Sequence, residues 1–168
     1  MLKIRKANTK DFGRIMEIYA SAQDFMIRSG NPNQWGHFNP TKEMIISDIN
    51  TGVCRVVYDD DGIHGVFALI EDGEPTYSYI EGGTWQNDEP YITIHRVASD
   101  GKVRGIFKFA ADHCKSLSPN VRIDTHAENL VMQRHIEANG FLRCGTIYLA
   151  NGSPRIAYQW TDPDSSSR

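Results

Sequence analysis

The sequence has no run of apolar residues that approaches the length of a membrane span, and its first residues, MLKIRKANTKDF, lack the apolar segment of a signal peptide. It also has little excess charge of either sign, because its formal net charge is only −3 at pH 7. That balance gives no general attraction for nucleic acid or for an anionic membrane surface. We therefore expect a cytoplasmic protein without a nucleic-acid or membrane partner.

Cysteine is scarce as well. Cys54, Cys114 and Cys144 are odd in number and far apart, so buried thiols in a reducing compartment are expected instead of disulfides. No metal site is predicted, because the closest set of metal-binding residue types, 112–114, would point in different directions from a helix. A Walker-type nucleotide site is excluded, because no Gly-x-x-x-x-Gly-Lys-Ser/Thr motif is present.

The remaining composition is that of an ordinary globular chain, with 40% hydrophobic and 23% charged residues and neither repeats nor a linker. One domain is expected over residues 1–160, followed by a disordered polar tail at 161–168. Hydrophobic spacing predicts the element order β-α-α-β-β-β-α-β-α-β-β. Strands are expected at 2–7, 53–58, 63–70, 92–98, 121–126, 141–149 and 155–160, and helices at 12–26, 41–49, 103–117 and 127–139.

The stretch from Ile92 to Phe107 is the most informative. It predicts a strand, a turn at Ser99-Asp100-Gly101 and then the start of a helix. This geometry leaves backbone N–H groups at the helix N-terminus without partners in the helix, and with Lys102 and Arg104 beside them they suit a phosphate or pyrophosphate. The alternative is an ordinary strand–helix connection with two solvated cations.

Two loops carry aromatic residues. Trp35 lies in a loop after the first helix, and Tyr79 and Trp85 lie in the long segment 71–89. A tryptophan in a loop either packs against the core or forms part of a recognition surface. Both interpretations remain open, and these three residues are the candidates for substrate binding.

The element order and two motifs resemble those of the GNAT (GCN5-related) N-acetyltransferase superfamily. The first motif, Lys102 to Phe107, stands where the family has Arg/Gln-x-x-Gly-x-Gly/Ala, and the second combines Asn129 with Gly140-Phe141. The resemblance implies an α+β fold with a mixed, twisted sheet flanked by helices, and acetyl-CoA as the cofactor. It also implies that the amides of the turn bind the coenzyme A pyrophosphate. The backbone amide and carbonyl groups at Val97 would bind the pantetheine arm. The candidate cofactor-binding residues are Arg96, Val97, Lys102, Val103, Arg104, Gly105, Ile106, Phe107, Asn129 and Met132.

Three positions depart from the family pattern. Lys102 replaces Arg or Gln, which is a mild change because the amides do most of the binding. Phe107 stands where a small residue normally lets the cofactor approach, so the turn must differ or the ring must point away. Ile136 replaces the tyrosine that in many members protonates the departing thiolate, a step that a hydrocarbon side chain cannot perform.

Acetyl transfer to an amine needs a base for the amine proton and a donor for the leaving thiolate. His95 is a candidate base because it titrates nearest neutrality and should share a strand face with Val97, although a core histidine is equally consistent. Glu81 and Glu89 are further candidate bases, although both are also consistent with solvated loop carboxylates, and His126 is a fallback. Tyr148, with Tyr79 and Tyr91, is a candidate acid, although each ring is also consistent with packing alone.

These observations predict an acetyl-CoA-dependent N-acetyltransferase that acts, as a monomer or homodimer, on the amine of a small molecule or peptide. The alternatives are a non-catalytic module of the same fold that binds or senses acyl-CoA, and an interaction domain that binds no coenzyme A.

Overall fold

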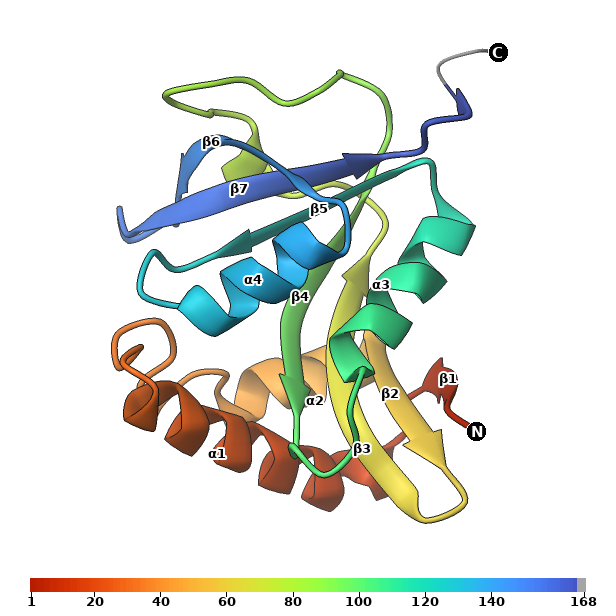
Figure 1. Cartoon of the computed structure of the whole chain (residues 1–168). Helices are drawn as coiled ribbons and strands as arrows, with labels where there is room; N and C mark the ends of the chain where they lie inside the picture. The colour runs from red at the N-terminus through yellow and green to blue at the C-terminus, as the bar shows by residue number, and fades with distance from the viewer. Residues whose placement is uncertain (166–168) are drawn as a thin grey trace. The chain divides into compact units, whose positions relative to one another are not determined.

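The structure is a computed structural model that describes residues 1–165 and divides the chain into two compact units. Unit 1 comprises Met1–Leu69 and His95–Ala110, and unit 2 comprises Ile70–Ile94 and the chain from Ala111 onward. The helices and strands follow one another in the predicted order (Figure 1). They are β1 (Lys3–Lys6), α1 (Phe12–Arg28), α2 (Lys42–Asn50), β2 (Cys54–Asp59), β3 (Gly62–Ile70), β4 (Ile92–Ser99), α3 (Ile106–Leu117), β5 (Asn120–Thr125), α4 (Leu130–Ala138), β6 (Leu142–Tyr148) and β7 (Pro154–Thr161).

The strands form a mixed sheet of seven in the order β1-β2-β3-β4-β5-β7-β6. In unit 1, β1 and β3 both pair with β2 in antiparallel fashion. The apolar stripes of α1 and α2 cover one face of these strands, which follows from their amphipathic spacing. The resulting core contains Ile15, Ile18, Tyr19, Ala22, Ile45, Ile49, Cys54, Val56, Val66 and Ala98.

Helix α3 begins on the opposite face of β3. Gly65 and Val66 alternate across the strand, and Val66 belongs to the core under α1 and α2. A Cβ atom added at Gly65 would lie 2.5 Å from Cγ2 of Ile106 and 3.3 Å from the carbonyl oxygen of Ala98. The missing side chain at Gly65 is therefore what lets the first residue of α3 pack against this strand.

Unit 2 contains the parallel pair expected from the strand–helix–strand unit. β4 and β5 pair at Ile92↔Val121 and Thr93↔Arg122, and β5 then pairs along its length with β7 in antiparallel fashion. Helix α4 lies against one face of β7, where the Tyr158 hydroxyl donates to Glu137 at 3.3 Å. The segment before β4 covers the other face, with Tyr77 packed on Ala157 and Ile147.

Element ends differ from the prediction where local capping decides them. Helix α4 starts at Leu130, later than predicted, because the Asn129 side chain accepts from the amide of Met132 and caps the helix there. Thr161 was assigned to the tail, but it is the last residue of β7. Asp162 and Ser165 form a turn, and residues 166–168 of the predicted tail lie outside the described residues.

The three cysteines are buried, as predicted, and none of them is in a disulfide within residues 1–165. Burial raises the pKa of the Cys54 thiol to about 12, so it remains protonated at neutral pH. No helix in this part of the chain is both long enough and apolar enough to cross a bilayer.

The close contact between Gly65 and Ile106 leads to a prediction about stability. Gly65→Ala is expected to lower the free energy of unfolding by about 1–3 kcal/mol, because the added methyl group overlaps Ile106 and the adjacent strand. Gly13→Ala in α1 is the matched control: nothing lies within 4 Å of its new Cβ, and alanine favours the helix. Urea unfolding measures both variants, and equal stabilities would contradict the packing argument.

Candidate functional site

The segment between β4 and α3 forms an open turn in unit 1. Gly101 and Gly105 have φ values of +77° and +79°, a region that favours glycine, and a Cβ added at either position would meet no atom within 4 Å. Ser99 Oγ accepts from the amide of Gly101, at 3.0 Å. Within residues 1–165, no hydrogen bond engages the amides of 103–106, so the N-terminus of α3 retains donors for an anion.

The first residues of α3 resolve the question raised by Phe107. Because the helix begins at Ile106, Phe107 falls in its first turn and its ring is only 8% exposed. Phe107 is thus packed into the protein, as the alternative in which its ring points away from the cofactor requires. Lys102 and Arg104 are exposed, so their charges are available beside the free amides.

Strand β4 is irregular at Arg96, which has a φ of +51° and is the single non-glycine residue with positive φ in residues 1–165. Two contacts hold it. The guanidinium of Arg96 donates to both carboxylate oxygens of Asp48, at 2.8 and 2.9 Å, and the Tyr19 hydroxyl donates to the Arg96 carbonyl oxygen at 2.7 Å. Burial raises the pKa of Tyr19 well above its ordinary value, so the hydroxyl keeps its proton.

This irregularity bears on His95 and Val97, which lie on either side of it and are both half-buried. The expectation that their side chains share one face assumed a regular strand, and the left-handed residue between them interrupts the alternation. The candidacy of His95 as the base stays a prediction. The side chain of Arg96 serves the Asp48 ion pair, and its predicted contact with the cofactor also stays a prediction.

In unit 2, the structure brings together two of the predicted catalytic residues. The Tyr148 hydroxyl donates a short hydrogen bond to the Glu81 carboxylate, and residues 81 and 146 form an isolated antiparallel bridge that sets this geometry. The bond raises the pKa of Tyr148 above its ordinary value, because ionising the phenol would place two anions together. The ring of Tyr79, which is 61% exposed, lies 6.5 Å from that of Tyr148, centroid to centroid.

Glycines make this arrangement possible. A Cβ added at Gly83 would lie 1.9 Å from the carbonyl oxygen of Cys144, and one added at Gly145 would lie 2.7 Å from that of Glu81. The 80–83 segment can therefore approach β6 closely only because both positions lack side chains.

The two candidate tryptophans have packing contacts. Trp85 donates from Nε1 to the carbonyl oxygen of Tyr77 at 2.9 Å, and the guanidinium of Arg122 lies 4.0 Å from the centroid of its ring. Trp35 packs edge-on against Tyr19, with ring centroids 5.7 Å apart, beside the core of unit 1. These contacts support the core-packing interpretation that the sequence left open.

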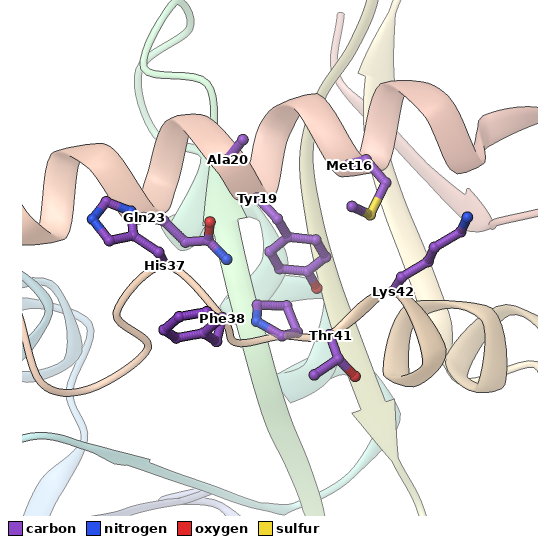
Figure 2. Close-up of a pocket in the computed structure, with 9 residues that line it drawn as sticks. Met16, Tyr19, Ala20, Gln23, His37, Phe38, Thr41 and Lys42 are labelled. Atoms are coloured by element: carbon purple, nitrogen blue, oxygen red, sulfur yellow. The ribbon is translucent and has the colours of Figure 1, made fainter.

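The Trp35 loop nevertheless borders a cavity of about 270 Å³ within unit 1 (Figure 2). One wall is the face of α1 that carries Met16, Tyr19, Ala20 and Gln23. The other wall comprises His37, Phe38, Pro40, Thr41 and Lys42. Phe38 is 82% exposed, an unusual environment for a phenylalanine. Sequence reasoning selected the tryptophan of this loop and missed Phe38, although the two aromatics are close in sequence.

Helix α4 and its N-cap contain three of the positions discussed for the resembled family. Asn129 is buried and its Oδ1 accepts from the amide of Met132 at 3.0 Å, so the family asparagine caps the helix here. Met132 is half-buried. Ile136 is fully buried, which places a hydrocarbon in the core where many members of the resembled family have a tyrosine.

His126, the fallback base, lies just after β5. Burial, with a smaller contribution from nearby Arg155, holds the pKa of His126 below its ordinary range. Burial thus favours the neutral ring, but its Nδ1 accepts from the amide of Glu128 at 3.0 Å, so its acceptor nitrogen is engaged.

Comparisons with known proteins identify the class to which this fold belongs. The sequence matches no family model and no curated protein. Among solved structures, a GNAT-family acetyltransferase from Streptococcus agalactiae is 30% identical, with a TM-score of 0.86 and 95% of each chain covered. GNAT-family acetyltransferases from Listeria monocytogenes (17% identity, TM-score 0.70, 95% of this chain and 94% of that one) and Bacillus cereus (19%, 0.58, 96% and 98%) share the fold.

The fold is that of an acetyltransferase, and the predicted α+β fold class is confirmed. The chain belongs to the GNAT acetyltransferase family.

The hydrogen bond between Tyr148 and Glu81 can be tested by titration. Glu81→Gln removes the negative charge beside the phenol and is expected to lower the pKa of Tyr148 toward the ordinary value of about 10. NMR of ¹³C-labelled tyrosine, with Tyr148→Phe for assignment, measures the shift. Tyr158 is the internal control, because burial raises its pKa to about 12 and that value should not move. An unchanged Tyr148 titration would mean that the bond is absent in solution.

Proposed function

We propose that the protein is an acetyl-CoA-dependent N-acetyltransferase that transfers an acetyl group directly to the amine of a small molecule or peptide. The observation that carries the proposal is the open turn before α3. Its amides at 103–106 lack partners within the described residues, and its glycines leave room for a ligand to approach the backbone. Family membership supports the choice of acetyl-CoA as that ligand.

The residues that would hold the cofactor fit an anionic diphosphate. The amides of 103–106 would donate to it, with the exposed cations Lys102 and Arg104 beside them. When bound, acetyl-CoA supplies an acyl group activated as a thioester. The backbone of Val97, next to the irregular Arg96, is the proposed partner of the pantetheine arm, and Asn129 and Met132 keep their proposed places among the cofactor contacts.

The Glu81–Tyr148 pair is the proposed acid–base group. Glu81 accepts the proton that the amine must lose before it can attack, and the phenol of Tyr148 stays protonated because its pKa is raised. Tyr148 is then a donor for the thiolate, a role that Ile136 cannot fill. The exposed ring of Tyr79 provides an aromatic surface beside this pair, suited to a cationic amine.

The cavity beside α1 is a second proposed binding site, within unit 1. Met16, Tyr19 and Pro40 give it an apolar floor, and Gln23 and Lys42 add polar groups (Figure 2).

A second candidate function is a non-catalytic module that binds acyl-CoA. The observation that favours it is the fully buried Ile136 at the position of the family tyrosine. Assays of acetyl-CoA consumption with a panel of primary amines separate the two. Turnover with any amine supports the enzyme, whereas tight binding without turnover on the whole panel supports the module.

The proposed cofactor-binding turn leads to a prediction about a bulky side chain at Gly105. Gly105→Trp is expected to abolish acetyl-CoA binding in isothermal titration calorimetry, because the indole occupies the approach to the amides and the residue is strained at φ +79°. Gly152→Trp is the matched control, since Gly152 has φ +84° and equally open space but lies in the β6–β7 turn. Unchanged affinity in Gly105→Trp would count against the site.

The acid–base pair predicts a loss of turnover without a loss of cofactor binding. Glu81→Gln and Tyr148→Phe are each expected to lower kcat about a hundredfold, because each removes one proton-transfer group. The dissociation constant for acetyl-CoA should stay the same. His95→Ala and His126→Ala, measured alongside, test the other base candidates. A large loss only in one histidine variant would transfer the role of base to that residue.

A further inference from the structure

We propose that Arg14 is a positioning residue for the cofactor: through Asp100 it holds the turn before α3 in the form whose amides can bind a diphosphate. The inference rests on the proposed function, because it concerns the turn assigned to acetyl-CoA. It adds residues of α1 and β3 that neither motif contains.

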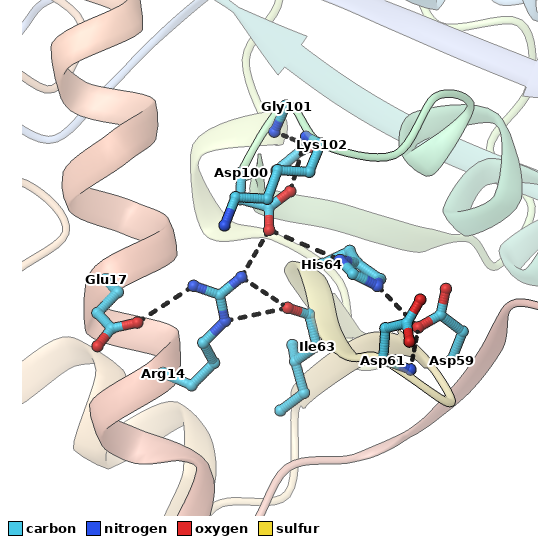
Figure 3. A network of polar contacts seen from close by, with 10 residues as sticks. Arg14, Glu17, Asp59, Asp61, Ile63, His64, Asp100, Gly101 and Lys102 are labelled. Atoms are coloured by element: carbon cyan, nitrogen blue, oxygen red, sulfur yellow. Dashed lines mark hydrogen bonds and ion pairs between the residues drawn. The ribbon is translucent and has the colours of Figure 1, made fainter.

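Arg14 reaches the turn from α1 (Figure 3). Its Nε and Nη2 donate to the carbonyl oxygen of Ile63, at 3.1 and 2.9 Å, which fixes the plane of the guanidinium on β3. Nη2 also donates to Oδ2 of Asp100 at 2.6 Å, and Nη1 binds the exposed Glu17 at 3.1 Å. A planar group with donors on several edges can make these contacts at once, and an ammonium group cannot.

The carboxylate of Asp100 has two functions. Oδ2 receives Arg14, while Oδ1 accepts from the amide of Lys102 at 2.9 Å and so shapes the turn. The side chain of Asp100 is only 5% exposed, and its own amide donates to the carbonyl oxygen of His64 at 3.1 Å. Because the two oxygens belong to one rigid group, a carboxylate held by Arg14 also fixes the direction of the Lys102 amide.

His64 supports the same carboxylate from the other side. Its ring is almost buried, with Nε2 2.8 Å from Oδ1 of Asp59 and Nδ1 3.6 Å from Oδ2 of Asp100 (Figure 3). The longer distance is not a hydrogen bond, so the direct bond to Asp100 comes from Arg14. This makes the arginine the contact whose removal most directly frees Asp100.

The amides at 101 and 102 are occupied by Ser99 and Asp100, whereas no hydrogen bond within residues 1–165 engages those of 103–106. Without the Arg14 contact, the turn samples other conformations. Only a fraction of the molecules then has the conformation that binds the ligand, so the apparent affinity falls. The expected consequence is a change in affinity for the diphosphate-bearing cofactor, with little change in the fold of either unit.

The test compares Arg14→Gln, Arg14→Lys and Glu17→Gln. Glu17→Gln is the matched control, because it removes the exposed partner of the same guanidinium and leaves Asp100 untouched. By calorimetry, Arg14→Gln should weaken acetyl-CoA binding about tenfold, Arg14→Lys should restore part of the affinity, and Glu17→Gln should bind as the wild type does.

A second measurement separates positioning from a general loss of structure. Hydrogen exchange of the cofactor-free protein should accelerate in the peptide covering 99–106 in Arg14→Gln and remain unchanged over α2 and β1. Acceleration throughout unit 1, or acetyl-CoA affinity equal to that of the wild type, would overturn the proposal. If the wild type itself does not bind acetyl-CoA, the proposed function fails; if it binds and Arg14→Gln binds equally well, only the role of Arg14 fails.

Discussion

The left-handed backbone at Arg96 is the constraint on which the centre of β4 depends. Such a conformation costs about 1–2 kcal/mol for a residue with a side chain, and it persists only where neighbours determine it. Here α2 supplies Asp48 to the guanidinium and α1 supplies the Tyr19 hydroxyl to the carbonyl oxygen. The side chain and the carbonyl group of Arg96 are thereby both fixed. The strand cannot relax to a regular ladder without leaving a buried hydroxyl or a carboxylate unsatisfied.

Helix α1 therefore does more than bury an apolar stripe. From its inner face Tyr19 holds the irregular residue of β4, and from its side Arg14 holds Asp100, four residues further along the chain. One helix thus contacts both backbone features that are proposed to bind the cofactor, the irregular strand and the turn. Glycine supplies the conformational freedom at 101 and 105, and the ion pair limits it.

The sequence predicted the element order and the turn because both are encoded locally, by hydrophobic spacing and by turn residues. Arg14, Asp48 and His64 could not be found in this way, since each acts on a residue far away in the chain and no local pattern records the pairing. Phe107 was ambiguous for a related reason: whether its ring blocks the turn depends on where α3 begins, which is Ile106, whereas the hydrophobic spacing placed the start of the helix at residue 103. The turn of the candidate site could therefore be predicted from the sequence, but the ion pair between Arg14 and Asp100 that holds it could not.

The absence of a tyrosine at position 136 need not remove acid catalysis from the proposed reaction, because proton transfer depends on where a group lies and not on which element carries it. In the cofactor-free protein, the proton of Tyr148 is committed to Glu81. An acceptor ammonium group would form a stronger, charge-assisted bond to that carboxylate than a neutral phenol does. In the proposed reaction, the arriving amine would therefore displace Tyr148 from Glu81 and leave the carboxylate as the base and the phenol as the acid. Under this proposal, the exchange of one hydrogen bond on binding would provide both proton-transfer groups.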